Sequence, residues 1–407
     1  MEKYMNIVIV GHVDHGKSTL IGRLLYDTKS VPESIMDEIK KVCEELGRNV
    51  EFAYLLDSLE EEREQSVTID TTQIFFKTPM REYTIIDAPG HKEFLKNMIT
   101  GASLAEAAIL IVDAKEGVQE QTKRHAYILS MLGLKQVIVV INKMDLVGYD
   151  EKVFIRVKDD VLGFLEKIGI NPGYVIPISS MKGDNVATKS GSMPWYNGIT
   201  ILDALDTFKT GPGMSEKPMR FPVQDVYKTE DKRILVGRVE AGRLKEGDEI
   251  TFLPSGKKTR IKSVEIWNQQ RKEAEAGESI GITLEEPLFI ERGEVACSGT
   301  LPEASDRIRA SLFWMSNAPI SLNEKVILKC TTQEVPCFIE SIDKKMNSST
   351  LEIIEKAGSE LNETEIGNVI IKTEKQVITE NFNDIEALGR FVIVRNENTA
   401  AGGITIA

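Results

Sequence analysis

The residues best suited to chemistry form a glycine-rich segment near the start of the chain. It comes directly after the apolar run Met5–Val10 and opens a helix-compatible stretch, Ser18–Leu25. Two glycines separated by four residues let backbone N–H groups and the helix N-terminus surround a triphosphate, while a lysine neutralises the outer phosphates and a serine ligates Mg²⁺. The segment therefore predicts a phosphate-binding loop, with an ordinary glycine turn as the alternative. It reads Gly11, His12, Val13, Asp14, His15, Gly16, Lys17 and Ser18, followed by Thr19.

A second motif, Asp87-Ala88-Pro89-Gly90-His91, follows the apolar run Tyr83–Ile86. A carboxylate at the end of such a strand can hold Mg²⁺ through water, and Gly90 lets the backbone approach a γ-phosphate. We therefore expect Asp87 and Gly90 in the nucleotide site. The alternative is an ordinary strand-to-helix turn in which Asp87 caps backbone amides.

A third motif, Asn142-Lys143-Met144-Asp145, follows the run Gln136–Ile141 and is the candidate for binding the nucleotide base. Guanine offers N1–H and an exocyclic amine to one carboxylate, so Asp145 can pair with it, whereas adenine lacks that pair of donors. Asn142 is expected to brace the loop and Lys143 to lay its stem over the ring. Backbone support on the other side of the base is expected from Ser179, Ser180 and Met181. N-K-x-D alone is a common surface sequence, but the order of the three motifs predicts GTP with Mg²⁺.

These motifs are separated by alternating apolar runs and helix-compatible stretches, a pattern that predicts a doubly wound, mostly parallel sheet with ligands at the carboxyl ends of the strands. The alternating run Thr68–Phe76 is expected to form an edge strand. The apolar runs are Met5–Val10, Tyr83–Ile86, Ala107–Val112, Gln136–Ile141 and Val175–Ile178. The helix-compatible stretches are Ser18–Leu25, His91–Gly101, Gln119–Leu132, Glu151–Ile168 and Ile199–Phe208.

The sequence pattern changes after the segment Gly211–Pro218. This segment is rich in proline and glycine and is expected to be a linker. Beyond it come short β-branched runs with turns between them, as in small β-barrels. The remaining length is large for one barrel, so we expect two. The predicted fold is thus an α/β P-loop GTPase domain, residues 1–213, followed by β-barrels at residues 219–301 and 302–407.

Composition narrows the class further. The chain of 407 residues is 42% hydrophobic, which is enough for substantial cores, and carries a net charge of -13. No part of it has a basic excess, which argues against a nucleic-acid partner but leaves one open. The four cysteines lack C-x-x-C spacing and are expected to be buried or neutral thiols. The chain has no apolar run of membrane-spanning length and no leader, so we expect it to be cytoplasmic.

With these motifs in this order, the chain resembles the translation-factor GTPases of the elongation factor Tu class over its whole length. The resemblance implies that Ser18 and Thr68 ligate Mg²⁺ together with Asp87, and that Thr68 belongs to the first switch. It implies catalytic roles for Lys17, Thr68 and His91, with His91 orienting the attacking water. Positioning of that water suits phosphoryl transfer, which needs an aligned nucleophile more than a strong base.

The same resemblance places a hydrophobic gate at Val13 and Val67 beside that water. Ser66 stands where the family normally has glycine, so the first switch is expected to close differently. The alternative for His91 is a residue at the start of a helix with no catalytic role. His125 belongs to no motif and is expected to be a partly exposed helix residue.

Within the class, several stretches look more like the GTPase subunit of bacterial ATP sulfurylase than like the tRNA carriers. They are Glu62–Gln65, Ser179–Val186, Phe313–Met315 and Asn362–Gly367. This similarity implies a regulatory subunit in a hetero-oligomer, coupling GTP hydrolysis to formation of adenosine 5′-phosphosulfate and pyrophosphate from ATP and sulfate by a catalytic adenylyltransferase subunit.

The alternative is an elongation-factor-like GTPase that delivers aminoacyl-tRNA to the ribosome. Its best support is the basic cluster Lys257–Lys262, although such a strand is more often a solvated sheet edge that discourages self-pairing. A nucleotide-gated scaffold with negligible turnover is a third hypothesis.

Overall fold

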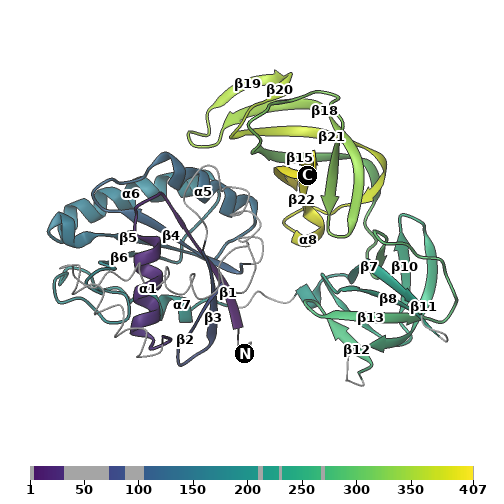
Figure 1. Cartoon of the computed structure of the whole chain (residues 1–407), viewed down its shortest axis with the longest axis horizontal. Helices are drawn as coiled ribbons and strands as arrows, with labels where there is room; N and C mark the ends of the chain where they lie inside the picture. Colours follow the sequence, from purple (N-terminus) through teal and green to yellow (C-terminus); the bar gives the residue numbers. More distant parts are fainter. Residues whose placement is uncertain are drawn as a thin grey trace. The chain divides into compact units, whose positions relative to one another are not determined.

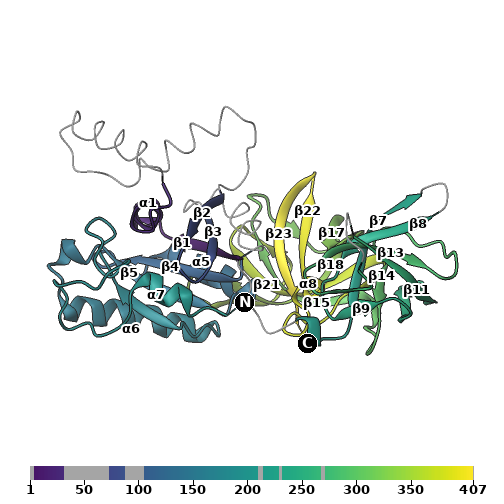
Figure 2. The ribbon, with the colours of Figure 1, turned by 90° about the horizontal axis from the view of Figure 1, so that it is seen from below.

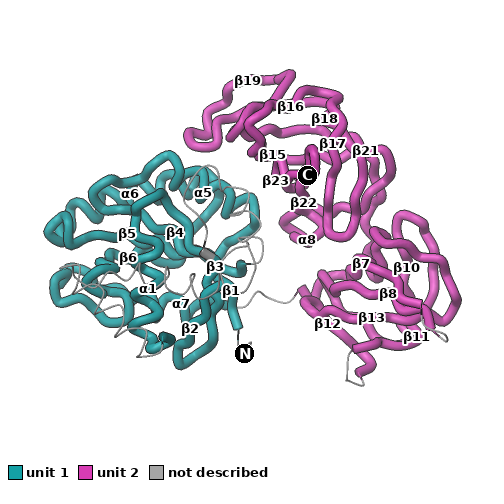
Figure 3. Tube along the Cα trace, in the orientation of Figure 1, with its two compact units in different colours: residues 1–210 teal, residues 211–407 magenta. Residues whose placement is uncertain are grey.

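The computed structural model describes residues 4–31, 73–87, 105–209, 214–228, 232–266 and 271–406. It divides into two compact units, residues 1–210 and 211–407, shown in Figure 3. The boundary lies at the start of the expected linker Gly211–Pro218. Within the described residues, no helix is both long and apolar enough to cross a membrane.

The first unit is built on a six-stranded sheet in the order β2-β3-β1-β4-β5-β6. All neighbours pair in parallel except the edge strand β2, which is antiparallel to β3. The central strands are buried on both faces, as their continuous apolar runs predict. The strands are β1 (Tyr4–Gly11), β2 (Gln73–Lys77), β3 (Glu82–Asp87), β4 (Ala107–Asp113), β5 (Val137–Asn142) and β6 (Tyr174–Pro177).

Helices cover both faces of this sheet, with α1 and α7 on one face and α5 and α6 on the other (Figure 1). The core between the sheet and the first pair contains Ile7, Ile109, Leu24 and Leu205. The doubly wound prediction is therefore confirmed. The helices among the described residues are α1 (Lys17–Asp27), α5 (Glu120–Met131), α6 (Glu151–Lys167) and α7 (Ile201–Asp206), with a short 3₁₀ helix at Met144–Val147.

The second unit begins with a closed six-stranded barrel in the order β10-β11-β13-β8-β7-β14. Phe221, Phe252 and Ile282 fill its interior. A separate two-stranded sheet joins β9 to β12. The strands are β7 (Arg220–Lys228), β8 (Arg233–Arg238), β9 (Arg243–Lys245), β10 (Glu249–Leu253), β11 (Lys257–Glu265), β12 (Glu273–Glu275), β13 (Ser279–Leu284) and β14 (Val295–Cys297).

A second sheet follows in the order β17-β22-β23-β15-β21-β18-β19. Because β17 also pairs with β18, six of these strands close into a ring and β19 extends it. Figure 2 shows β22 and β23 side by side as a hairpin. The strands are β15 (Ala304–Trp314), β16 (Ile320–Ser321), β17 (Val326–Cys330), β18 (Gln333–Asn347), β19 (Ile353–Gly358), β20 (Glu360–Leu361), β21 (Glu365–Ile378), β22 (Arg390–Arg395) and β23 (Asn398–Thr405), with helix α8 at Glu386–Gly389.

The two barrels are joined by a buried arginine. Arg220, at the start of β7, pairs with Glu380 of the second barrel and donates to the carbonyls of Ser298 and Thr300. Its side chain is 1% exposed, so its charge is compensated entirely within the protein. Beside it a small apolar cluster, which includes Cys297 and Leu388, spans both barrels.

Two expectations about single segments have opposite outcomes. The basic cluster Lys257–Lys262 is not a sheet edge, because β11 pairs with β10 on one side and β13 on the other within the closed barrel. The cysteine expectation is confirmed for Cys297, Cys330 and Cys337, which are free and buried. Burial raises the pKa of each thiol to about 12, so all three are neutral. Cys43 lies outside the described residues.

Candidate functional site

The glycine-rich segment joins β1 to α1 at the carboxyl end of the central strand of the sheet. Gly16 immediately precedes the helix with φ of 93°, and a Cβ there would come within 2.4 Å of the Asn142 side-chain nitrogen. Only glycine combines that dihedral with that close approach. The first turn of α1 contains no acidic residue, so its N-terminus remains favourable for an anion.

Two of the residues expected on the phosphate side, Lys17 and Ser18, open this helix. The Lys17 Nζ donates to the carbonyls of Gly11 and His12 at 3.1 and 3.0 Å, which holds the ammonium at the loop. Ser18 is exposed in the first helical turn, and Asp87 is the last residue of β3, the strand beside β1. The Ser18 hydroxyl is an oxygen donor of the kind that Mg²⁺ prefers. Gly90, His91, Ser66, Val67 and Thr68 lie outside the described residues, as does Glu62–Gln65.

Asn142 connects the phosphate loop to the base side of the site. Its Nδ2 donates to the carbonyl of His15 at 2.9 Å, and its Oδ1 accepts from the backbone N and the hydroxyl of Ser180 at 3.0 and 2.9 Å. The side chain is 1% exposed. One amide therefore fixes the spacing between the loop that would hold phosphates and the two segments that would hold the base.

A residue that the motifs did not include, Asp113, anchors Lys143. The two side chains form an ion pair of 2.8 Å, and Asp113 also accepts from the backbone amides of Lys115 and Glu116. Burial raises the pKa of the Asp113 carboxyl, but Lys143 and the two amides outweigh burial and hold it below its usual range. The sequence shows only that a carboxylate follows the apolar run Ala107–Val112, and the sheet register then places Asp113 beside Asn142.

The base loop, defined as Ser179–Asn185, is held at several points. The amide of Gly183 donates to the Ser179 carbonyl at 2.7 Å, and Asn185 donates to the Pro177 carbonyl at 2.9 Å. The Tyr149 hydroxyl, just past the N-K-x-D segment, donates to Asp184 at 3.0 Å. Ser179 and Ser180 are buried, while the Met181 side chain is exposed. The structure thus brings Asn142, Lys143 and the base loop together at one edge of the sheet.

The expectation that His125 is partly exposed is wrong. It is fully buried on α5, which packs against β1 and β4 beneath the phosphate loop. Burial, aided by the positive charge of Lys17, lowers the pKa of His125 to about 3. His15, also fully buried, has its pKa lowered mainly by burial. Both imidazoles are therefore neutral near pH 7.

The buried His125 predicts a loss of stability in mild acid. Because its folded pKa, about 3, lies below the unfolded value of 6.5, the unfolded chain binds the proton first as pH falls. Neutral His125 makes its full contribution to the free energy of unfolding above pH 6.5, and this contribution declines towards pH 3. The expected loss between pH 7 and pH 5 is about 2 kcal/mol. Urea unfolding at the two pH values should show a smaller loss for His125→Gln than for the wild type. An identical loss in both proteins would contradict the assignment.

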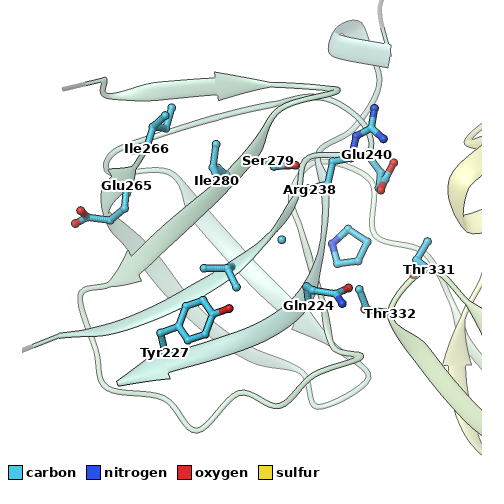
Figure 4. A pocket seen from close by; sticks show the side chains of 13 residues that line it. Gln224, Tyr227, Arg238, Glu240, Glu265, Ile266, Ser279, Ile280, Thr331 and Thr332 are labelled. Atoms are coloured by element: carbon cyan, nitrogen blue, oxygen red, sulfur yellow. The ribbon is translucent and has the colours of Figure 1, made fainter. Parts of the chain in front are cut away.

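A separate cavity of about 600 Å³ lies on the second unit, where β7, β8 and β13 of the first barrel meet a turn of the second. Figure 4 shows Glu265 and Tyr227 on one side of it and Thr331 on the other. Arg238 and Glu240 lie near the Thr331 end, and burial raises the pKa of Glu240. The cavity combines one aromatic face with charges of both signs.

Comparison with known families covers almost the whole chain. Residues 2–210 match the model described as the elongation factor Tu GTP binding domain. Residues 232–297 match elongation factor Tu domain 2, and residues 307–406 match the GTP-eEF1A C-terminal domain-like model. The chain belongs to the elongation factor Tu/1-alpha family of translation GTPases. The fold prediction, an α/β GTPase domain followed by two small β-barrels, is confirmed.

Members of the elongation factor Tu/1-alpha family resemble the chain along its full length. Elongation factor 1-alpha of Pyrococcus horikoshii is 41% identical, and that of Methanosphaerula palustris is 37% identical; each alignment covers 99% of this chain and 97% of the relative. A crystal structure of sup35 complexed with GDP covers 100% of this chain and 94% of its own at 23% identity and a TM-score of 0.47. As a member of this family the chain is a GTPase that binds GTP with Mg²⁺.

The prediction of an ATP sulfurylase subunit is wrong, and so is the partner it implied, a catalytic adenylyltransferase subunit in a hetero-oligomer. The full-length relatives that overturn it are elongation factors 1-alpha at about 40% identity. Three of the four short stretches behind the prediction lie within the described residues, where they have structural roles. Phe313 and Trp314 are fully buried in the second barrel. The Asn362 amide and side chain bond to Glu365 within a turn. Gly183–Asn185 holds the base loop.

Proposed function

We propose that this chain is an elongation-factor-type GTPase that delivers aminoacyl-tRNA to the ribosome. The observation that carries this proposal is the identity of about 40% to elongation factors 1-alpha over almost the whole chain. Matches to the models of all three domains agree with it. Such a role places the protein in the cytoplasm. We also retain residues 1–213, 219–301 and 302–407 as its proposed domains.

In this proposal the nucleotide lies along the carboxyl edge of the sheet. The backbone of Gly11–Thr19 and the Lys17 ammonium bind the phosphates, and Ser18, Thr68 and Asp87 hold Mg²⁺, which neutralises charge developing on the transferred phosphoryl group. Asp145 binds guanine, between Lys143 and the segment Ser179–Met181. Gly90 lets the backbone approach the γ-phosphate, and His91 orients the attacking water.

The cavity on the barrels is our candidate site for the aminoacylated 3′ end of the tRNA. Its volume of about 600 Å³ accommodates a nucleoside with an attached aminoacyl group. Tyr227, which is 56% exposed, provides a ring on which a base can stack, an interaction of about 1–3 kcal/mol. Gln224, Arg238 and Glu265 provide polar groups for the ribose and the base edge.

Protection of the aminoacyl ester from hydrolysis tests the delivery role. The chain, loaded with a non-hydrolysable GTP analogue, should slow spontaneous deacylation of aminoacyl-tRNA at sub-micromolar protein, whereas the GDP-loaded chain should give little protection. Deacylated tRNA should not compete. Tyr227→Ala should weaken protection about tenfold, through loss of stacking, while leaving the affinity for GTP unchanged.

Ile155→Ala is the matched control, because Ile155 is also an exposed apolar side chain, lies on α6 of the GTPase unit and does not line the cavity. Absence of protection with either nucleotide, or equal protection with both, would overturn the proposed function. Normal protection by Tyr227→Ala would overturn only the placement of the 3′ end in the cavity.

A further inference from the structure

Arg23 connects the helix that follows the phosphate loop to the base loop. It lies on α1, six residues beyond Lys17, and its side chain is 18% exposed. Its guanidinium lies against Gly183, since a Cβ built on Gly183 would be 2.0 Å from Nη2, 2.2 Å from Cζ and 2.7 Å from Nη1. Three atoms at such similar short distances show that the guanidinium plane covers the backbone of Gly183.

The guanidinium is held in this position from its other side. Arg23 Nε donates to both carboxylate oxygens of Asp27 at 2.9 Å, and Cζ lies 5.6 Å from the centre of the Tyr26 ring. Asp27 is only 10% exposed, so water screens the pair weakly. A cation four residues before an anion is the less favourable order along a helix, so the pair stabilises α1 less than the reverse order would.

Gly183 is the point of the base loop where a flat cation fits. It has φ of 81°, and its amide donates to the Ser179 carbonyl, so its backbone closes the turn that carries Ser180 and Met181. Ser180 in turn bonds to Asn142, and the amide of Met144 donates to the Ile178 carbonyl. Movement of Gly183 is therefore transmitted to the segment that carries Asp145.

We infer that Arg23 is a positioning residue for guanine recognition: by covering Gly183 it holds the base loop, and through it Asp145, in register with the phosphate loop. The two halves of the nucleotide site are then linked twice, by Asn142 at the loop itself and by Arg23 one helical turn and a half further along α1. This inference rests on the proposed base contacts of Asp145 and not on tRNA delivery, whose failure would leave the nucleotide measurements unchanged.

Nucleotide competition binding with GTP and ITP tests the inference. ITP lacks the exocyclic amine that donates a hydrogen bond to a correctly placed Asp145. Misplacement of Asp145 should therefore weaken the binding of GTP more than that of ITP. For Arg23→Ala we expect the dissociation constant to rise about tenfold for GTP and about twofold for ITP, with a faster release of GDP. Arg23→Lys should behave similarly, because a compact ammonium cannot cover the backbone as a planar guanidinium does.

Two further variants separate positioning from general stability. Lys158→Ala is the matched control, since it removes a cation placed 6.0 Å from the Phe154 ring on α6, outside the site, and should leave both dissociation constants unchanged. Gly183→Ala should weaken GTP binding more in the wild type than in Arg23→Ala, where the clash with the guanidinium is absent.

Thermal unfolding of the nucleotide-free proteins completes the test. Equal losses for GTP and ITP accompanied by a lower Tm would show that Arg23 is merely structural and would overturn the inference. Unchanged affinities in Arg23→Ala, or an identical effect of Gly183→Ala in both backgrounds, would overturn it as well.

Discussion

Asp145→Asn should change the base preference of the nucleotide site from guanine to xanthine. An asparagine amide donates where the carboxylate accepted, so it repels the exocyclic amine of guanine and instead pairs with the carbonyl that xanthine has at that position. Loss of a matched polar pair within a site is among the most selective changes available, and we expect GTP affinity to fall about a hundredfold or more. XTP affinity should rise above that for GTP. Competition binding against a fluorescent nucleotide measures both.

Asp150→Asn is the matched control for this exchange. Asp150 lies five residues further along and caps α6 by accepting from the Lys152 amide at 2.8 Å, without a place in the nucleotide site. Asparagine caps helices about as well as aspartate, so both stability and base preference should be preserved. Retention of GTP preference by Asp145→Asn would remove Asp145 from base recognition.

His91→Ala should slow GTP hydrolysis by about a hundredfold or more while GTP affinity stays within about twofold. The expected role of His91 is to align water with the γ-phosphorus, an interaction made fully only as the nucleophile attacks. Removing such a group lowers the rate of the chemical step without weakening ground-state binding. Single-turnover hydrolysis, with affinity measured separately on a non-hydrolysable analogue, distinguishes the two quantities.

The control for His91→Ala is His91→Gln. The glutamine amide can still bind a water molecule, so His91→Gln should retain more GTPase activity than His91→Ala. Parallel losses of affinity and rate in His91→Ala would identify a structural residue at the start of a helix. Full activity in His91→Ala would remove it from the reaction.

The fold and the centre of the site were predictable because both depend on local patterns. Buried parallel strands have continuous apolar runs, and motifs at their carboxyl ends must converge on one edge of the sheet. Gly16, Lys17 and Asn142 are therefore found where the sequence predicts. The short alternating strands after residue 218 likewise indicated barrels, since their turns recur at regular intervals.

What could not be predicted depends on contacts between distant residues. Asp113 pairs with Lys143 only because the register of β4 and β5 places Asp113 beside Asn142. His125 seemed half exposed because helix periodicity does not reveal that α5 is buried on most of its faces. The branch of the family was mistaken because the prediction rested on short stretches, whereas the relatives that match over the full length are elongation factors 1-alpha.

The GTPase domain should bind guanosine triphosphate with Mg²⁺ at the loops that join β1 to α1 and β5 to α6, and should discriminate against adenine. Titration calorimetry of the full chain with GTP and then with ATP, each in the presence of Mg²⁺, tests it most directly. We expect one GTP per chain and an affinity for GTP at least about a thousandfold above that for ATP. Equal affinities for the two nucleotides, or no heat with GTP, would contradict the account.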